Sequence, residues 1–141
     1  MSTTLRKLSV LFVLIGGVTL YAAANKSKPS VATLPPVVVK TFPVAGAMHV
    51  DATKTKEIRV TFSKDMLDKN MSWVQLSSES YPKVTGDIHF DVDNRTCIAP
   101  VELEPGHAYA IWFNNNKYQN FKDRDEHSSV PYLLVFETEP K

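Results

Sequence analysis

From residue 36 onward, the chain repeats one pattern: short runs rich in β-branched and aromatic residues, separated by turn residues, with no sustained helical period. Such runs at a spacing of roughly 8–12 residues are typical of an all-β sandwich or barrel. The expected strands, seven in all, are residues 37–42, 57–62, 71–77, 83–90, 95–101, 107–113 and 131–138.

The alternation within these runs predicts which side chains are buried. In the run 57–62, Ile58, Val60 and Phe62 share one face and polar side chains share the other, as in a half-buried strand. The run 83–90 also alternates, and residues 91–94 (Asp-Val-Asp-Asn) supply turn chemistry before the next run. We therefore expect residues 83–101 to form a hairpin.

The N-terminus differs from the rest of the chain. Arg6 and Lys7 precede an uncharged apolar run over residues 8–21, which three alanines follow. The run is shorter than the ~20 residues that span a bilayer, and the form is that of a signal peptide cleaved after Ala24. We expect a signal peptide at 1–24, a linker at 25–35 and one domain at 36–141; an uncleaved membrane anchor is the alternative.

The charge balance argues against one class of function, and the cysteine content excludes one source of stability. Without residues 1–24 the chain has 14 basic and 15 acidic residues, so it lacks the basic excess on which nucleic-acid binding depends. Cys97 is the only cysteine, so no intramolecular disulfide can form. With the signal peptide, these features predict an exported, periplasmic or extracellular protein, not stably membrane-spanning after cleavage, whose stability comes from packing.

Four short motifs occur in a recognisable order. They are F-P-V-A-G-A at 42–47, T-F-S-K-D-M at 61–66, L-E-P-G-H-A-Y at 103–109 and V-F-E-T at 135–138. Together they resemble the bacterial Ig-like domain family of surface-layer and envelope proteins over residues 36 to 139. The resemblance implies a seven-stranded immunoglobulin/fibronectin-III-like Greek-key β-sandwich. Leu103 and Tyr109 also bracket a Pro-Gly turn, which predicts a tyrosine corner.

The resemblance implies little about the specific function. Such domains act as spacers, adhesive modules or accessory domains, and the same sandwich serves many unrelated roles. In one respect the chain departs from the family. The D-x-x-G-N loop before the last strand corresponds here to residues 123–127, Asp-Arg-Asp-Glu-His, without the Gly-Asn pair.

Strand alternation predicts an exposed apolar patch. If Tyr109, Ile111 and Phe113 face the core, Trp112 faces outward. By the same rule, Leu133 and Val135 face outward on the neighbouring last strand. With Val74 and Leu76 inward, Trp73 would face outward too. The predicted partner-binding residues are Trp73, Trp112, Leu133 and Val135. Alternatively, Trp73 is a core residue and Trp112 lies under a loop.

Other polar residues form no recognised site. Asp91, Asp93 and Asn94 in one turn and Asp123, Asp125 and Glu126 in another match no calcium loop, and solvated turns explain both. The histidines lack metal-ligand spacing, and Cys97 follows the inward alternation of its strand. We therefore expect no catalytic residue, no metal and no cofactor.

The sequence favours a non-catalytic module for binding, adhesion or spacing in the bacterial cell envelope, with an envelope protein or a polysaccharide as partner. A carbohydrate-binding module that stacks sugars on outward-facing tryptophans is the alternative. An enzyme is the third hypothesis, for which no residue constellation argues.

Overall fold

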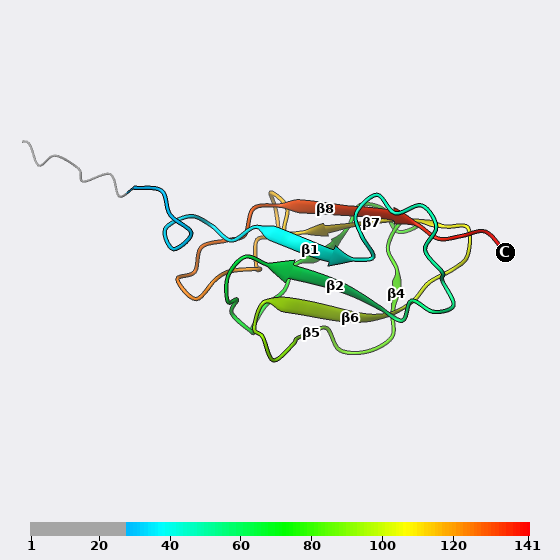
Figure 1. Ribbon diagram of the computed structural model, residues 1–141, viewed down its shortest axis with the longest axis horizontal. Coiled ribbons are helices and arrows are strands. Elements are labelled where there is room, and N and C mark those ends of the chain that lie inside the picture. Colours follow the sequence, from blue (N-terminus) through cyan, green and yellow to red (C-terminus); the bar gives the residue numbers. More distant parts are fainter. Residues whose placement is uncertain (1–27) are drawn as a thin grey trace, which may run out of the picture.

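The computed structural model describes residues 28–141, and these residues form two antiparallel β-sheets without a helix (Figure 1). The strands are β1 (Val38–Phe42), β2 (Glu57–Phe62), β3 (Trp73–Gln75), β4 (Lys83–Val84), β5 (His89–Phe90), β6 (Thr96–Glu102), β7 (Ala108–Phe113) and β8 (Tyr132–Glu137). The predicted all-β sandwich is confirmed. It has eight strands in place of seven because the run 83–90 is divided between β4 and β5.

Pro100 explains that division. β4 pairs with residues 101–102 of β6, and β5 pairs with residues 97–98. Between them, the N–H of Thr85 donates to the carbonyl of Pro100 at 2.9 Å, but Pro100 has no N–H with which to continue the ladder. The predicted hairpin is confirmed by the antiparallel pairing of β5 with β6.

The two sheets have different sizes and a characteristic strand order. The larger sheet runs β1-β2-β6-β4, with β5 also paired to β6, and the smaller sheet runs β3-β7-β8. If β4 and β5 are counted as the two parts of one strand, four strands face three, with the third, seventh and eighth strands in the smaller sheet, which is the arrangement of a constant-type immunoglobulin sandwich. The order therefore agrees with the Greek-key fold expected from the motifs.

Aromatic rings fill the space between the sheets. Phe62 from the larger sheet and Phe113 and Phe136 from the smaller sheet are at most 1% exposed, as is Phe121 from the loop between β7 and β8. The ring centroids of Phe62 and Phe121 are 4.8 Å apart. Burial of each such ring contributes roughly 1.5–3 kcal/mol, so packing alone can hold a domain without disulfides.

The tyrosine corner is confirmed. The hydroxyl of Tyr109 accepts a hydrogen bond from the backbone N–H of Glu104 at 2.7 Å. The hydroxyl of Thr138 strengthens the same corner, because it donates to the carbonyl of Glu104 at 2.6 Å and accepts from the N–H of His107 at 2.9 Å. These bonds fix the turn that leads into β7.

The two edges of the smaller sheet are unlike each other. After β1, the chain crosses to β8, where the N–H of Gly46 donates to the carbonyl of Val135 at 2.7 Å and the N–H of Glu137 donates to Ala47 at 2.8 Å. This segment covers the edge of β8. On β3, at the opposite edge, no backbone hydrogen bond among residues 28–141 covers the outer side.

The segment before β1 is tied to the domain. Residues 31–34 form a turn, and the ammonium group of Lys64 donates to the carbonyls of Ala32 and Leu34. The predicted signal peptide at 1–24 lies outside the described residues. Within residues 28–141 no helix is long and apolar enough to cross a membrane.

Candidate functional site

The outer face of the smaller sheet carries the apolar side chains that the alternation predicted. Trp112 of β7 pairs with Val74 of β3 on one side and with Leu133 of β8 on the other. All three are partly exposed, and none packs against the core. Val135, 41% exposed, continues the patch beside Ala110. We call Val74, Trp112, Leu133 and Val135 the outer patch.

Trp73 does not belong to the outer patch, so the predicted outward orientation is wrong. It pairs with Phe113, an inward residue, and its ring meets the Phe113 ring edge-on at 4.7 Å and 81°. The indole Nε1–H points to the sulfur of Cys97 at 3.4 Å. Trp73 therefore packs against the core and is only partly exposed.

In β3, the side chains that face the core are the opposite set from the predicted one. The alternation could not decide between the two sets because both faces of this strand are apolar. Val74 and Leu76 were expected to be inward, but Val74 lies beside Trp112 and Leu76 is exposed. Met71 and Trp73 are inward instead, with the Met71 sulfur 3.2 Å from that of Cys97. A tryptophan and a methionine bury more apolar area than a valine and a leucine, so this phase has the lower free energy.

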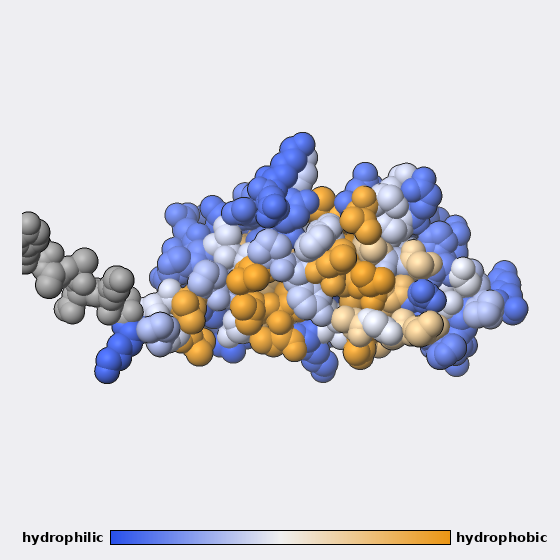
Figure 2. Space-filling view, turned by 90° about the horizontal axis from the view of Figure 1, so that it is seen from above, coloured by the Kyte–Doolittle hydropathy of each residue, from blue (hydrophilic) through white to orange (hydrophobic). Residues whose placement is uncertain are grey.

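Apolar side chains also gather where β1 and β8 run side by side. Figure 2 looks down on this side of the molecule and shows hydrophobic residues in its middle, with hydrophilic residues at its border. Val39 and Val44, which come from β1 and the crossing segment, are more than half exposed, and Val135 belongs to β8. The outer patch thus adjoins further exposed apolar surface.

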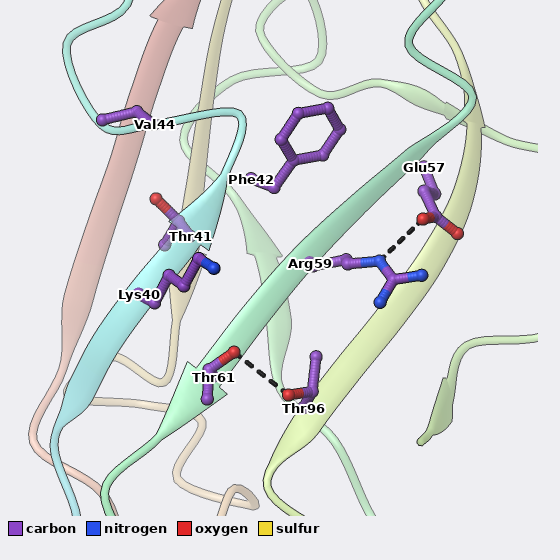
Figure 3. A pocket seen from close by; sticks show the side chains of 8 residues that line it. All are labelled: Lys40, Thr41, Phe42, Val44, Glu57, Arg59, Thr61 and Thr96. Atoms are coloured by element: carbon purple, nitrogen blue, oxygen red, sulfur yellow. Dashed lines mark hydrogen bonds and ion pairs between the residues drawn. The ribbon is translucent and has the colours of Figure 1, made fainter. Parts of the chain in front are cut away.

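A groove on the larger sheet is lined by charged and hydroxyl side chains together with Phe42 and Val44 (Figure 3). Its volume is about 470 Å³. The lining residues come from β1, the residues after it, β2 and β6: Lys40, Thr41, Phe42, Val44, Glu57, Arg59, Thr61 and Thr96. Arg59 Nε donates to Glu57 Oε1 at 2.6 Å, and this bond raises the pKa of the guanidinium. Arg59 and Glu57 pair with each other, and no nucleophile is poised beside a base in the groove.

The acidic loop before β8 is built around a buried carboxylate. Asp123 is 2% exposed and accepts from the Lys64 ammonium at 2.9 Å and from the backbone N–H groups of Asp125 and His127 at 3.0 and 2.8 Å. Burial acts to raise the pKa of Asp123, but the bonds from Lys64 and His127 outweigh it and hold the pKa below its ordinary value.

Asp123, Asp125 and His127 bring ligand atoms within 4.8 Å of one another. The Lys64 ammonium already occupies the position that a cation would take beside Asp123. The residues therefore suit an internal ion pair better than a metal ion.

The other acidic turn, between β5 and β6, also has a structural role. Asp93 accepts from the backbone N–H groups of Arg95 and Thr96 at 2.9 and 2.8 Å and from the Thr96 hydroxyl at 2.7 Å. Asn94 adopts a positive φ of 55°. These are turn-forming contacts of the kind that Asp and Asn favour.

Cys97 has none of the properties of a nucleophile. Its side chain is fully buried, and burial raises the pKa of the thiol to about 12. His107 does not act as a base for it, because His107 contacts the carbonyl of Glu79 through Nε2 at 2.6 Å and packs beside Tyr109. A protonated, buried thiol is unreactive.

The comparisons with known proteins agree with this fold. Residues 32–138 match the family described as Bacterial Ig-like domain. The chain belongs to this family. The resemblance found in the motifs is thereby confirmed, and the tyrosine corner lies within the matched region.

Two solved structures are similar to this bacterial Ig-like domain. One is a crystal structure of the S-layer protein rSbsC (20% identity, TM-score 0.47) and the other is a structure of domains 1–6 of the surface layer protein SbsC (20% identity, TM-score 0.48). Each alignment covers 77% of this chain and 14% of the other. No curated protein matches the chain significantly.

Glu126 adopts the backbone conformation expected of the glycine that is missing from the family's loop. Glu126 occupies the fourth position of the loop, where the family carries glycine, and has a positive φ of 65°. Its N–H donates to the carbonyl of Asp123 at 3.0 Å. The loop therefore keeps a left-handed residue at this point although glutamate adopts that conformation less readily than glycine.

Two features of the bacterial Ig-like domain were missed in the sequence. Lys64, within the F-S-K-D-M motif, holds Asp123 from 59 positions away, and no local pattern reports such a pairing. The aromatic residues Tyr81 and Tyr118 meet Trp73 at one pocket. A search for aromatics flanking the third strand would have found Tyr81, whereas Tyr118 comes from a distant loop.

Proposed function

We propose that this bacterial Ig-like domain is an exported, non-catalytic module of the cell envelope that binds a protein partner through the outer patch. The observation that carries the proposal is the row of Val74, Trp112 and Leu133 across the smaller sheet, away from the core. An exposed apolar patch centred on a tryptophan has the composition of a protein-binding site.

The location of the patch supports the same function. Val135 extends it toward the covered edge of β8, where Val39 and Val44 add exposed apolar surface. A flat sheet face without a deep cavity suits a protein surface better than a small substrate. A non-catalytic role is supported by the charge pairing of the groove and by the buried state of Cys97.

Co-sedimentation tests the proposal. The purified protein is mixed with whole bacterial envelope and, separately, with isolated cell-wall polysaccharide, and the parent is compared with Trp112→Ala. We expect binding to whole envelope that weakens at least tenfold in Trp112→Ala, because truncation of a central interface tryptophan commonly costs more than 1.4 kcal/mol. Phe42→Ala is the matched control, since it removes an exposed aromatic ring from the other sheet.

The same experiment also distinguishes a protein partner from a carbohydrate ligand. Binding to isolated polysaccharide that Trp112→Ala abolishes would favour sugar stacking on the outer patch instead of a protein partner. Equal binding of the parent and Trp112→Ala would refute the outer patch as the contact surface, and no binding to either preparation would refute it and leave a spacer.

A further inference from the structure

A pocket of about 380 Å³ lies at the uncovered edge of β3, apart from the groove on the larger sheet. Its walls come from β3 and the residues before it, from the chain leading to β4, and from the loop between β7 and β8: Met71, Ser72, Trp73, Val74, Gln75, Tyr81, Tyr118 and Asn120. Three aromatic residues thus meet at one shallow site, and Tyr118 reaches it from a part of the sequence distant from Trp73 and Tyr81.

Trp73, one of the three aromatic residues of the pocket, is held in place by contacts on its core side. The indole N–H of Trp73 is directed to the buried sulfur of Cys97, and its ring packs edge-on against Phe113. Because those contacts lie on the core side, Trp73 can present its exposed part to the pocket without changing conformation. Tyr81 is partly buried, and this burial raises its pKa.

The loop that carries Tyr118 and Asn120 is also pre-organised. The side-chain oxygen of Asn115 accepts from the backbone N–H of Tyr118 at 2.8 Å. The hydroxyl of Ser72 accepts from the N–H of Asn120 at 2.9 Å. Buried Asn114 binds the N–H and carbonyl of Phe121 at 2.9 and 3.0 Å, which anchors the end of the loop. A ligand would find this wall already ordered.

Four polar side chains that line the pocket have no hydrogen-bond partner among residues 28–141. Within residues 28–141, the hydroxyls of Tyr81 and Tyr118 and the side-chain amides of Gln75 and Asn120 form no hydrogen bond. Each amide offers donors and an acceptor, and each hydroxyl offers both. None of the lining residues is charged. The pocket therefore combines aromatic surface, free hydrogen-bonding groups and electrical neutrality.

We propose that the β3-edge pocket binds a neutral oligosaccharide of pyranose rings. A pyranose has apolar C–H faces that pack on aromatic rings and a rim of hydroxyls that pair with amides and phenols. An acidic sugar or a phosphate would need a cation in the lining, and none is there; the nearby Lys117 ammonium lies over the Tyr118 ring, 5.2 Å from its centroid, and is not a lining group. The proposal assumes a binding role for the domain but uses different residues from Trp112, Leu133 and Val135.

An extended peptide that adds a strand to β3 is the competing occupant. β3 is only three residues long, so it offers few backbone groups for such pairing. The side chains around the edge, which are aromatic and amide, provide the larger part of the recognition surface. This composition favours the saccharide.

Binding is tested with Trp73 as the only tryptophan. The Trp112→Phe protein is titrated with cellotetraose, maltotetraose, mannotetraose and chitotetraose, and with tetragalacturonate as the acidic probe. At least one neutral saccharide is expected to change the Trp73 fluorescence with a Kd of about 1 mM or below. It should also shift the side-chain amide NMR signals of Gln75 and Asn120, whereas tetragalacturonate should have no effect.

Substitutions at the exposed wall then locate the site. Tyr118→Ala and Gln75→Ala are each expected to weaken binding about fivefold or more, and Tyr81→Phe, which removes only a hydroxyl, about threefold. Phe42→Ala should bind like the parent. Trp73 itself is left intact, because its loss would disturb the core.

Several outcomes would overturn the proposal: no response to any neutral saccharide at roughly 10 mM, tenfold above the expected Kd; equal binding of tetragalacturonate; or tighter binding of a Thr/Val-rich peptide at the same residues. Failure of the outer-patch proposal would be recognised separately, because co-sedimentation would then not depend on Trp112.

Discussion

Replacement of Lys64 by methionine tests the most heavily buried ion pair of the described domain. The Lys64 side chain is 13% exposed and that of Asp123 is 3% exposed, and the two are joined at 2.9 Å. Methionine keeps most of the aliphatic length but removes the charge. Asp123 would then lose the lysine cation but retain its backbone donors from Asp125 and His127 and the contact of His127 Nδ1 at 3.2 Å.

The expected cost is large. Removal of one partner from a buried pair leaves an uncompensated charge and destabilises by about 3–5 kcal/mol. Backbone hydrogen bonds from the loop remain, so we expect the lower end, about 3 kcal/mol. The carbonyls of Ala32 and Leu34 also lose their donor, but they can turn to water because both residues are exposed. For a domain of this size, the loss corresponds to a decrease in Tm of roughly 10–15 °C.

The pH dependence gives a second readout. The pKa of Asp123 is lowered in the folded protein from 3.8, so the pair stabilises fully above that value and its contribution is lost as the pH falls through the lowered folded pKa. In Lys64→Met the cation is gone and burial raises this pKa, which favours the folded variant at acid pH. The difference in stability between parent and variant should therefore shrink as the pH falls from 7 toward 3.

Denaturant unfolding of both proteins over this pH range measures the effect. Lys54→Met is the matched control, because Lys54 is 85% exposed and its pairing with Asp51 at 2.9 Å is a surface ion pair, which water screens and which adds little to stability. A penalty for Lys64→Met no larger than that for Lys54→Met, or one that does not change with pH, would show that Asp123 needs no cation and would refute the reasoning.

Three further predictions follow from buried contacts. Tyr109→Phe removes the acceptor of the Glu104 N–H and should cost about 1–2 kcal/mol in denaturant unfolding; an unchanged midpoint would contradict the tyrosine corner as a source of stability. Trp73→Ala should cost about 3–5 kcal/mol but Trp112→Ala below about 1 kcal/mol, and equal losses in thermal unfolding would contradict the assigned faces. Cys97 should resist a thiol reagent in the native state at pH 8 and react completely in denaturant, so rapid native labelling would argue against its burial and its pKa of about 12.

The parts of the fold that were predicted correctly depend on local patterns. The run 57–62 became β2 with its exact bounds, because only one of its two faces is apolar. Tyr109 was placed at the corner because a Pro-Gly turn and a fixed spacing define the motif. Inward placement of Cys97 followed from its alternation with Ala99 and Val101, and all three are buried.

Long-range contacts were not predictable in the same way. The division of the run 83–90 depends on Pro100, which lies on the partner strand and interrupts the ladder there. The turn at 31–34 was expected to be an extended linker, since nothing in its composition indicates that Lys64 would bind its carbonyls. Each of these contacts needs the pairing partner to be known first.

Strand β3 shows why the outer patch was largely predictable from the sequence and the β3-edge pocket was not. Trp112 and Leu133 lie on long strands whose inward residues are unambiguous, so alternation placed these two residues of the outer patch correctly, whereas it placed Val74 of β3 inward. β3 is apolar on both faces, and its phase was decided by how well Trp73 fits between Phe113 and Cys97. That same choice leaves Trp73 at the uncovered sheet edge, where loops meet it. A sheet face can thus be predicted from the period of its own strands, whereas a binding site at a sheet edge requires the fold.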